Sequence, residues 1–229
     1  MKISNPFRSL TKFETALWIA SVLVVIGSAF VSGTSGILNM IASLIGVTAL
    51  IFVAKGFVIG QILTVVFSVF YGIISYHFAY YGEMITYLCM SAPMALMSVI
   101  SWVKHPYKDS SEVEVSHLTK KKLIIMTVLS LTVTIIFYFI LKALGTANLI
   151  VSTISVTTSF IAVFFTFLRS PYYALGYAAN DIVLIVLWIL ASIEDISYIS
   201  MVACFVMFLF NDLYGYYNWR RMRKRQENS

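Results

Sequence analysis

Eight apolar runs, each long enough to cross a lipid bilayer, constrain the fold of this chain more than any other feature of its sequence. They cover residues 13–32, 36–54, 57–79, 84–103, 122–144, 147–168, 171–192 and 197–218. A transmembrane helix needs about 20 mainly apolar residues. Only 11% of this chain is charged, whereas a soluble domain carries about 25%. The first run is too long for a signal peptide, so we interpret it as an anchor. We therefore predict an all-α integral membrane protein with eight transmembrane helices.

The positions of Lys and Arg orient these spans. Fifteen of the sixteen lie in the two terminal segments and in the connectors on one side of the membrane, and Lys142 alone lies on the other side. Lys and Arg are enriched in cytoplasmic connectors, so both termini are predicted to be cytoplasmic. Glu83, Glu194 and Asp195 fall in the opposite connectors. Because the net charge of +6 is spread over short connectors and tails, it does not indicate nucleic acid binding.

A short repeat indicates an internal duplication. Residues 39–48 and 148–157 are identical at six of ten positions and lie 109 residues apart, nearly half the chain length. Each copy has three spans, and one further span links the copies. Both copies therefore cross the membrane in the same direction, which is a parallel repeat as in the sugar-transporting SWEETs. Trp102 and Trp219 each close the last helix of a copy.

The duplication divides the chain into five predicted segments. These are a cytoplasmic N-terminus with an extra helix (1–35), a first three-helix repeat (36–103), a cytoplasmic loop with a linker helix (104–146), a second three-helix repeat (147–219) and a basic cytoplasmic tail (220–229). Lys55 and Arg169 each mark the turn after the first helix of a repeat. The connector 104–121, with Pro106 and three acidic residues, is predicted to be a solvated loop without a fold of its own.

Polar side chains recur on single faces of several spans, where they are costly unless they are paired or face water. Ser, Thr and Gly at such positions, including Gly56 and Gly60, are interpreted mainly as contacts between helices. Amides and carboxylates beside aromatic rings are instead typical of a substrate cavity. The predicted substrate-binding residues are Gln61, Thr64, Tyr71, Tyr177, Asn180, Asp181, Trp188, Asn211, Tyr214 and Asn218. The predicted polar face of the repeated helix comprises Asn39, Ser43, Asn148 and Ser152.

Asp181 and Asp212 allow two interpretations. A carboxylate within the membrane can carry a coupling proton. It can also hydrogen-bond a neighbouring Tyr or Asn, or contact the substrate, and we favour this second interpretation.

The sequence offers little support for catalysis. It contains no phosphate-binding loop, and its three His residues form no protease or hydrolase motif. Cys89 and Cys204 lie in apolar runs and are interpreted as packing residues. No metal-ligand spacing and no cofactor motif is present. A transporter is therefore favoured over an intramembrane enzyme or a helical scaffold, and solute flux into liposomes that contain only this protein would separate these classes.

Three stretches of sequence resemble the PnuC-type vitamin transporters. They are Gly60-Gln61 with Tyr71-Gly72, Tyr81-Gly82-Glu83-Met-Ile-Thr-Tyr87, and the two segments 172–188, with Asn180-Asp181, and 210–220, with Asn211-Asp212. The resemblance covers nearly the whole chain. It implies a bacterial inner-membrane protein with a 3+1+3 core similar to that of the SWEETs, assembled as a homotrimer, without a cofactor.

The resemblance also implies a substrate and a mode of transport. Members of this family move nicotinamide riboside, or in some cases thiamine, riboflavin or deoxynucleosides. They do so by facilitated diffusion, and phosphorylation inside the cell traps the substrate. Nicotinamide riboside transporters usually carry Trp-x-x-Trp before the Asn/Asp pair, but this chain has Ala174 and Tyr177 there. The sequence therefore leaves two alternatives open: which base the substrate carries, and whether transport is coupled to protons or is facilitated diffusion.

A binding hypothesis follows for a pocket between the two repeats. Four amide side chains would bond the ribose and the carboxamide, namely Gln61, Asn180, Asn211 and Asn218. Tyr71, Tyr177 and Trp188 would stack on the ring. Asp181 or Asp212 would offset the charge of a pyridinium. Rocking of one repeat against the other would give alternating access.

Overall fold

The computed structural model describes residues 5–31, 37–77, 81–146, 148–194, 196 and 199–229. Lys2 and Asp195 lie outside the described residues, and so do the side chains of Asn39 and Tyr81. Apart from isolated bridges, the regular structure in these ranges is helical, which confirms the predicted all-α class. Seven of the described helical spans are long and apolar enough to cross a membrane, and a shorter apolar helix makes the eighth.

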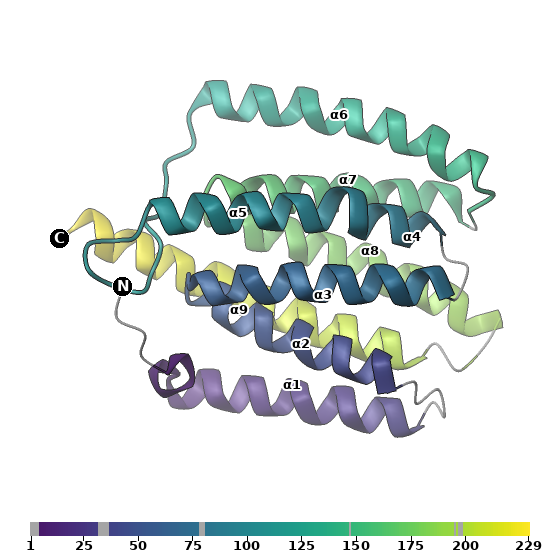
Figure 1. Ribbon diagram of the computed structural model, residues 1–229, viewed down its shortest axis with the longest axis horizontal. Helices are drawn as coiled ribbons and strands as arrows, with labels where there is room; N and C mark the ends of the chain where they lie inside the picture. The colour runs from purple at the N-terminus through teal and green to yellow at the C-terminus, as the bar shows by residue number, and fades with distance from the viewer. Residues whose placement is uncertain (1–4, 32–36, 78–80, 147, 195, 197–198) are drawn as a thin grey trace.

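The helices run side by side through the molecule (Figure 1). After a short turn of helix (Pro6–Ser9) they are α1 (Lys12–Val31), α2 (Ile37–Ala54), α3 (Val58–His77), α4 (Tyr81–Ile85), α5 (Ala92–Lys104), α6 (Lys120–Ala143), α7 (Leu149–Phe167), α8 (Tyr173–Glu194) and α9 (Ile199–Glu227). A π-helical turn (Thr86–Ser91) joins α4 to α5, so these three elements form one span. The first and last described residues lie at the same end of the bundle, together with the connector 105–119 (Figure 1). We call this the connector end.

Two helices begin or end at other residues than the predicted apolar runs do. α9 continues beyond residue 218, through most of the basic segment 220–229, to Glu227. No helix breaker follows Trp219, and Arg223 pairs with Glu227 at 2.7 Å, a spacing of four residues that stabilises a helix. Asn148 was expected inside a span, but it precedes α7 with a left-handed φ of 53°. Asn tolerates that conformation better than most residues do.

The π-helical turn has a local cause in the sequence. Pro93 lies near the start of α5 and has no backbone N–H, so a regular helix would lose a hydrogen bond there. A single π-helical turn is a common response to such a disruption and is frequent at functional sites. It carries Tyr87 into the interior between the helices, where it contacts the rings of Phe67 and Tyr71.

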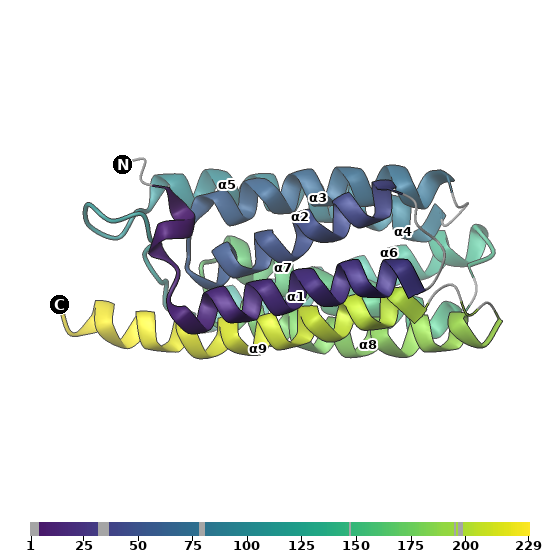
Figure 2. The same cartoon turned by 90° about the horizontal axis from the view of Figure 1, so that it is seen from below.

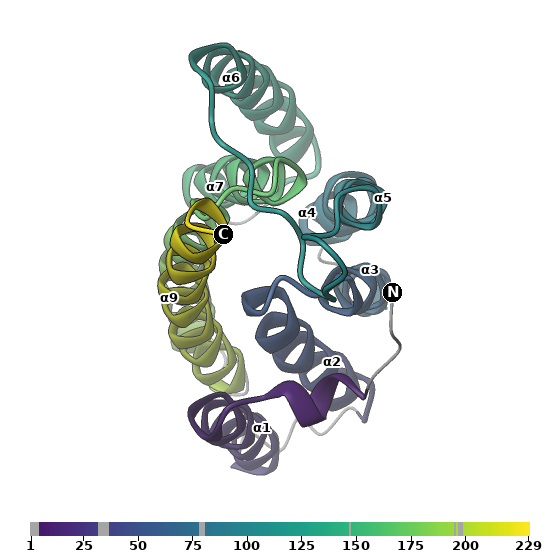
Figure 3. The same ribbon diagram turned by 90° about the vertical axis from the view of Figure 1, so that its left-hand side faces the viewer.

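The helices form two sets of three that pack crosswise. We call α2, α3 and the α4–α5 span the first bundle, and α7, α8 and α9 the second bundle. α2 packs against α9, and α5 packs against α7, so the first helix of each bundle lies against the last helix of the other (Figure 3). α6 lies at one edge of the molecule against α7, and α1 lies at the opposite edge against α2 and α9 (Figures 1 and 3).

Two tryptophans make the same contact in opposite directions. Trp219 of α9 donates from Nε1 to the carbonyl of Val53 in α2 at 2.9 Å. Trp102 of α5 donates from Nε1 to the carbonyl of Thr166 in α7 at 3.0 Å. Both indoles are fully buried, and their ring centroids lie 5.4 Å apart. Each tryptophan therefore ties the last helix of its own bundle to the first helix of the other.

The residues that precede the tryptophans repeat this pattern. Asn218 Nδ2 donates to the Ala54 carbonyl at 2.9 Å, and Ser101 Oγ donates to the Phe167 carbonyl at 3.0 Å. These bonds satisfy carbonyls in the last turn of a helix, which have no partner within the helix. Ala54 and Phe167 are 113 residues apart, whereas the sequence repeat has an offset of 109. The offset of the sequence repeat thus differs from the offset of these matching contacts by four residues, about one helical turn.

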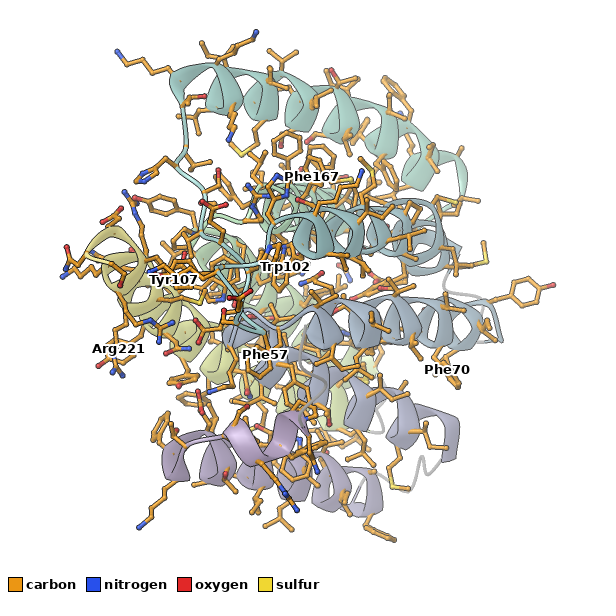
Figure 4. The ribbon with its side chains drawn as sticks, turned by 60° about the vertical axis from the view of Figure 1, so that its left-hand side comes forward. Phe57, Phe70, Trp102, Tyr107, Phe167 and Arg221 are labelled. Atoms are coloured by element: carbon orange, nitrogen blue, oxygen red, sulfur yellow. The ribbon has the colours of Figure 1, made fainter. Side chains whose placement is uncertain are left out.

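The connector 105–119 is mostly exposed or half-buried, as its composition predicts, but it is anchored to both bundles. Val113 N donates to the Gly56 carbonyl, in the turn after α2, at 2.9 Å, and Ser116 N donates to the Arg169 carbonyl, in the turn after α7, at 3.0 Å. Val113 and Val115 are buried among the core residues around the two tryptophans. Figure 4 shows Phe57 and Trp102 close to this connector. These two valines find apolar cover at the junction of the bundles, whereas the other residues of the connector are exposed or half-buried.

The end of α9 fixes the connector in place. Gln226 Oε1 accepts from Val115 N at 2.8 Å, and Gln226 Nε2 donates to the Val113 carbonyl at 3.1 Å. Arg225 forms an ion pair with Glu112 of the connector. The connector therefore contacts both bundles at the connector end.

Candidate functional site

Two buried carboxyl groups meet near the middle of the membrane-spanning region. Asp181 of α8 and Asp212 of α9 are each 3% exposed, and their carboxyl groups lie close to one another. Among the described residues, Asp181 Oδ2 has no hydrogen-bond partner. Buried charged groups are costly unless they are paired or bind a ligand. The pair is therefore a strong candidate for contact with a polar or cationic solute.

Tyr87 of the first bundle lies near this carboxyl pair and contacts a second tyrosine, Tyr71. The rings of Tyr71 in α3 and Tyr87 in the π-helical turn lie 4.5 Å apart between centroids. Tyr87 lies close enough to interact electrostatically with both Asp181 and Glu83. From the second bundle, Tyr177 lies near both aspartates. The centre of the molecule thus combines aromatic faces with carboxyl groups, and we call these five residues, Tyr71, Tyr87, Tyr177, Asp181 and Asp212, the central cluster.

A pocket of about 300 Å³ lies toward the end opposite the connector. It lies between α4, the end of α6, the start of α7 and the end of α8, so both bundles line it. Its polar and aromatic lining consists of Glu83, Thr86, Thr146, Asn148, Ser152 and Trp188. The volume falls within the range typical of small-molecule pockets. Glu83 links the pocket to the central cluster through its interaction with Tyr87.

The structure places seven of the predicted residues at these two sites. Tyr71, Tyr177 and Asp181 belong to the central cluster, and Asn180 lies beside it. Asn180 Oδ1 accepts hydrogen bonds from Thr158 at 2.9 Å and from Ser155 at 3.3 Å, so part of its capacity holds α7 to α8. Predicted residues that line the pocket are Trp188, Asn148 and Ser152.

Three further predicted residues lie on helices of the first bundle. Gln61 of α3 is buried at 2% exposure. Thr64 Oγ1 donates to the Gly60 carbonyl of its own helix at 2.9 Å, which is a structural role. Ser43 of α2 lies near the Cys204 thiol of α9, where the two bundles meet.

The remaining predicted residues, Asn211, Tyr214 and Asn218, face α1 or α2. Tyr214 Oη donates to Glu14 Oε1 at 2.7 Å, and Asn211 Nδ2 donates to Ser21 Oγ at 2.9 Å. Asn218 makes the bond to α2 described above. The structure therefore does not bring all ten predicted residues to one cavity.

Glu14 was missed as an important residue. It is 1% exposed, and its carboxylate pairs with Lys55 Nζ at 3.0 Å in addition to Tyr214. Its position inside the first apolar run was the available signal, because an acid there needs a partner. Tyr87 and Glu83 were also missed as site residues, since a π-helical turn disturbs the helical spacing that identifies a shared face.

The departure at residues 174 and 177 has a steric reason. Ala174 is fully buried in α8, and a Cβ atom built on Gly215 of α9 would lie 3.6 Å from its Cβ. The two helices approach closely at this point. Tyr177 packs edge-on against Tyr173, with ring centroids 6.2 Å apart. A tryptophan at 174 would need α8 and α9 to separate.

Comparisons with known proteins agree on one family. A family model described as "Nicotinamide mononucleotide transporter" matches residues 36–221. The chain is 28% identical to the nicotinamide riboside transporter PnuC of Neisseria mucosa over 225 residues, which cover 96% of this chain and 85% of that protein. It is 24% identical to the protein of the same name from Haemophilus influenzae over 226 residues, which cover 98% and 97% of the two chains.

A solved structure shows the same arrangement of helices. The crystal structure of the vitamin B3 transporter PnuC matches with a TM-score of 0.81 and 25% sequence identity. The match covers 95% of this chain and 94% of that one. It therefore includes α1, which lies outside the residues that the family model matches.

Proposed function

This chain belongs to the nicotinamide mononucleotide transporter family, whose members are membrane transporters rather than enzymes, and we propose that it takes up nicotinamide riboside. The observation that carries the substrate is the pairing of aromatic faces with carboxylates in the central cluster. Nicotinamide riboside contains a pyridinium ring with one positive charge. Such a ring gains about 0.5–2 kcal/mol from an aromatic face, and a nearby carboxylate attracts it further at low dielectric. Trp188 and Glu83 offer the same combination in the pocket.

The route of the substrate follows from the two sites. Nicotinamide riboside would enter the pocket beside Trp188 and Glu83, and then move to the central cluster. Support comes from the position of Tyr87, which lies near both Glu83 of the pocket and Asp181 of the central cluster. At the other end the connector bonds to both bundles. Release would require the connector end to open while the pocket closes, which is alternating access between two similar bundles.

We place the protein in the bacterial cytoplasmic membrane with both termini inside the cell. The location of fifteen of the sixteen basic residues supports this orientation, and the first and last described residues lie at one end of the bundle. We propose that the first and second bundles are the two repeats, as the crossed tryptophan bonds suggest. We further propose a homotrimer, which the mass of the detergent-solubilised protein would test.

Uptake into liposomes that contain only this protein tests the proposed function. We expect labelled nicotinamide riboside to enter until its concentrations inside and outside are equal, as in facilitated diffusion. An enclosed kinase that phosphorylates the substrate would then raise the total label inside. Accumulation driven by a pH gradient without a kinase would instead show proton coupling, for which the Asp181–Asp212 pair is the candidate. Absence of flux for every solute would overturn the transport proposal.

A panel of ligands tests the substrate. Nicotinamide riboside should bind more tightly than nicotinamide mononucleotide, thiamine, riboflavin and deoxynucleosides. A preference for a deoxynucleoside or thiamine would leave the transporter class intact but change the substrate, and would point to the altered residues at Ala174 and Tyr177.

Two substitutions test the position of the binding site. Asn180→Ala removes a buried amide beside the central cluster, together with its bonds from Ser155 and Thr158, and adds no charge. Gln61→Ala removes a buried amide from the first bundle. Both variants should bind the substrate more weakly. If both keep wild-type affinity for every substrate that the wild type binds, the site lies elsewhere.

A further inference from the structure

A second cavity, of about 910 Å³, lies at the connector end between α1 and α9. It is separate from the pocket beside Trp188, with which it shares no lining residue. Figure 2 shows α1 and α9 side by side along this face of the molecule. Nothing in the proposed uptake of nicotinamide riboside uses a site at this outer edge. We call it the α1–α9 groove.

The lining of the α1–α9 groove carries an excess of positive charge. It contains four basic residues, Lys55, Arg221, Lys224 and Arg225, and two acidic residues, Glu14 and Glu112. Lys55 pairs with Glu14 and Arg225 pairs with Glu112. Arg221 and Lys224 therefore stay without an acidic partner among the described residues. Two adjacent free cations at the mouth of a cavity favour an anionic ligand.

Arg221 is held in a defined position for such a ligand. Its guanidinium lies over the ring of Tyr217, 5.6 Å from the ring centroid. This contact leaves the N–H groups at the edge of the guanidinium free to bind a phosphate, for which their fork geometry is well suited. Figure 4 shows Arg221 projecting from the end of α9 away from the bundle.

An exposed apolar stripe on α9 leads to these cations. Phe210, Leu213 and Tyr217 are 55%, 48% and 58% exposed. They follow one another at intervals of three and four residues, and Arg221 comes four residues later, so all four share one face of the helix. Phe13 of α1 is 61% exposed and borders the same groove. The groove thus passes from an apolar surface at membrane depth to a basic surface at the membrane boundary.

We propose that the α1–α9 groove binds one anionic phospholipid, with its phosphate on Arg221 and Lys224 and an acyl chain along Phe210, Leu213 and Tyr217. Basic pockets between transmembrane helices on the cytoplasmic side are suited to anionic head groups. A free phosphate shares the head-group chemistry, but it has no use for the apolar stripe. The stripe is therefore the reason for choosing a lipid as the source of the phosphate.

Lipid retention measured by native mass spectrometry tests this proposal. The purified full-length protein is mixed with phosphatidylglycerol, phosphatidylcholine or inorganic phosphate, and thermal unfolding is followed in parallel. Phosphatidylglycerol should remain bound at one per chain and raise the unfolding temperature, while phosphatidylcholine and inorganic phosphate should do neither. The double variant Arg221→Gln/Lys224→Gln should bind phosphatidylglycerol roughly 25-fold more weakly, since each basic residue near an anionic lipid contributes about fivefold.

A matched control removes the same charge elsewhere. Lys120 and Lys121 are exposed at the start of α6, at the same end of the bundle but outside the groove. The variant Lys120→Gln/Lys121→Gln should retain phosphatidylglycerol as the wild type does. Equal losses in both double variants would overturn the proposal, because they would show a general effect of net charge. Protection by inorganic phosphate equal to that by phosphatidylglycerol would overturn it in favour of a soluble phosphate ligand.

Discussion

At the scale of single residues, the two buried aspartates supply the chemistry of this site rather than its packing. Asp181 and Asp212 come from adjacent helices, and Tyr87 of the other bundle lies near this pair. A pair of carboxyl groups serves a cationic ring better than a neutral one, because an uncompensated charge in a low dielectric attracts an opposite charge strongly.

Replacing the carboxyl groups should therefore affect cationic and neutral solutes differently. Asp181→Asn and Asp212→Asn keep the shape of the side chain and remove its charge. Each should weaken binding of nicotinamide riboside by about 10- to 100-fold, which is the usual value of a contact with a charged group. Binding of an uncharged deoxynucleoside should change little. Calorimetric titration of both ligands measures the difference, with Asp109→Asn in the exposed connector as the control. Equal losses for both ligands would argue against a charge contact.

The two tryptophans define a second effect at this scale. Trp102→Phe and Trp219→Phe each remove one buried indole N–H and leave one helix-end carbonyl without that partner. Each should lower the free energy of unfolding by about 1–3 kcal/mol. Thermal unfolding in detergent measures the loss. Because the two contacts match, we expect similar values, and a variant that unfolds like the wild type would show that its bond contributes nothing.

At the scale of helices, two glycines permit the close approach within each bundle. A Cβ atom built on Gly60 of α3 would lie 2.5 Å from the backbone nitrogen of Val53 in α2. A Cβ atom built on Gly176 of α8 would lie 2.8 Å from the Cα of Ala162 in α7. Both contacts are with backbone, which has little freedom to move away.

Alanine at these positions should force the helices apart. Gly60→Ala and Gly176→Ala should each cost about 1–3 kcal/mol of stability, as overpacking of a well-packed core usually does. Gly27 of α1 is the matched control, since nothing lies within 4 Å of a Cβ atom built there. Gly27→Ala should be neutral or stabilise by about 0.5–1 kcal/mol, because alanine favours a helix. Destabilisation by all three variants to the same extent would contradict the steric explanation.

The helices themselves could be predicted from the sequence, but not all of their neighbours. Apolar length and basic flanks are local properties, so the eight spans appear directly in the chain. The partner of a polar face is not local. Asn211 and Tyr214 share a face with Asn218, and composition alone assigned that face to a cavity. In the structure α1 covers part of this face of α9, because Glu14 and Ser21 of α1 are polar partners for Tyr214 and Asn211. α1 lies outside the two repeats, so a comparison of the repeats does not include it.

At the scale of the whole molecule, the connector joins the two bundles at one end. Its bonds to Gly56 and Arg169 connect the turns that follow the first helix of each bundle. Gln226 adds a bond from the end of α9 on each side of Glu114. If the bundles separate at this end, these contacts must break or the connector must move together with one bundle.

Weakening the connector should loosen this end without unfolding the bundle. Gln226→Ala removes the partners of the Val115 amide and the Val113 carbonyl. Amide hydrogen exchange over residues 112–116 should become faster, because local opening exposes these amides. Exchange in the interior of α7 should stay unchanged. Arg223→Ala, which breaks an exposed pair on the same helix, is the control. Unchanged exchange in the Gln226 variant would show that other contacts hold the connector.

The crossed tryptophan bonds have the symmetry of a dimer that happens to lie within one chain. In a two-fold dimer, a residue of the first subunit contacts a site on the second subunit. The same residue of the second subunit contacts the same site on the first. Trp102 on Thr166 and Trp219 on Val53 satisfy this relation between the bundles. The first bundle ends at the connector end, and the second begins at the opposite end. One extra membrane-spanning helix is therefore the shortest chain segment that can join two such bundles in parallel. α6, packed at the edge against α7, is that helix.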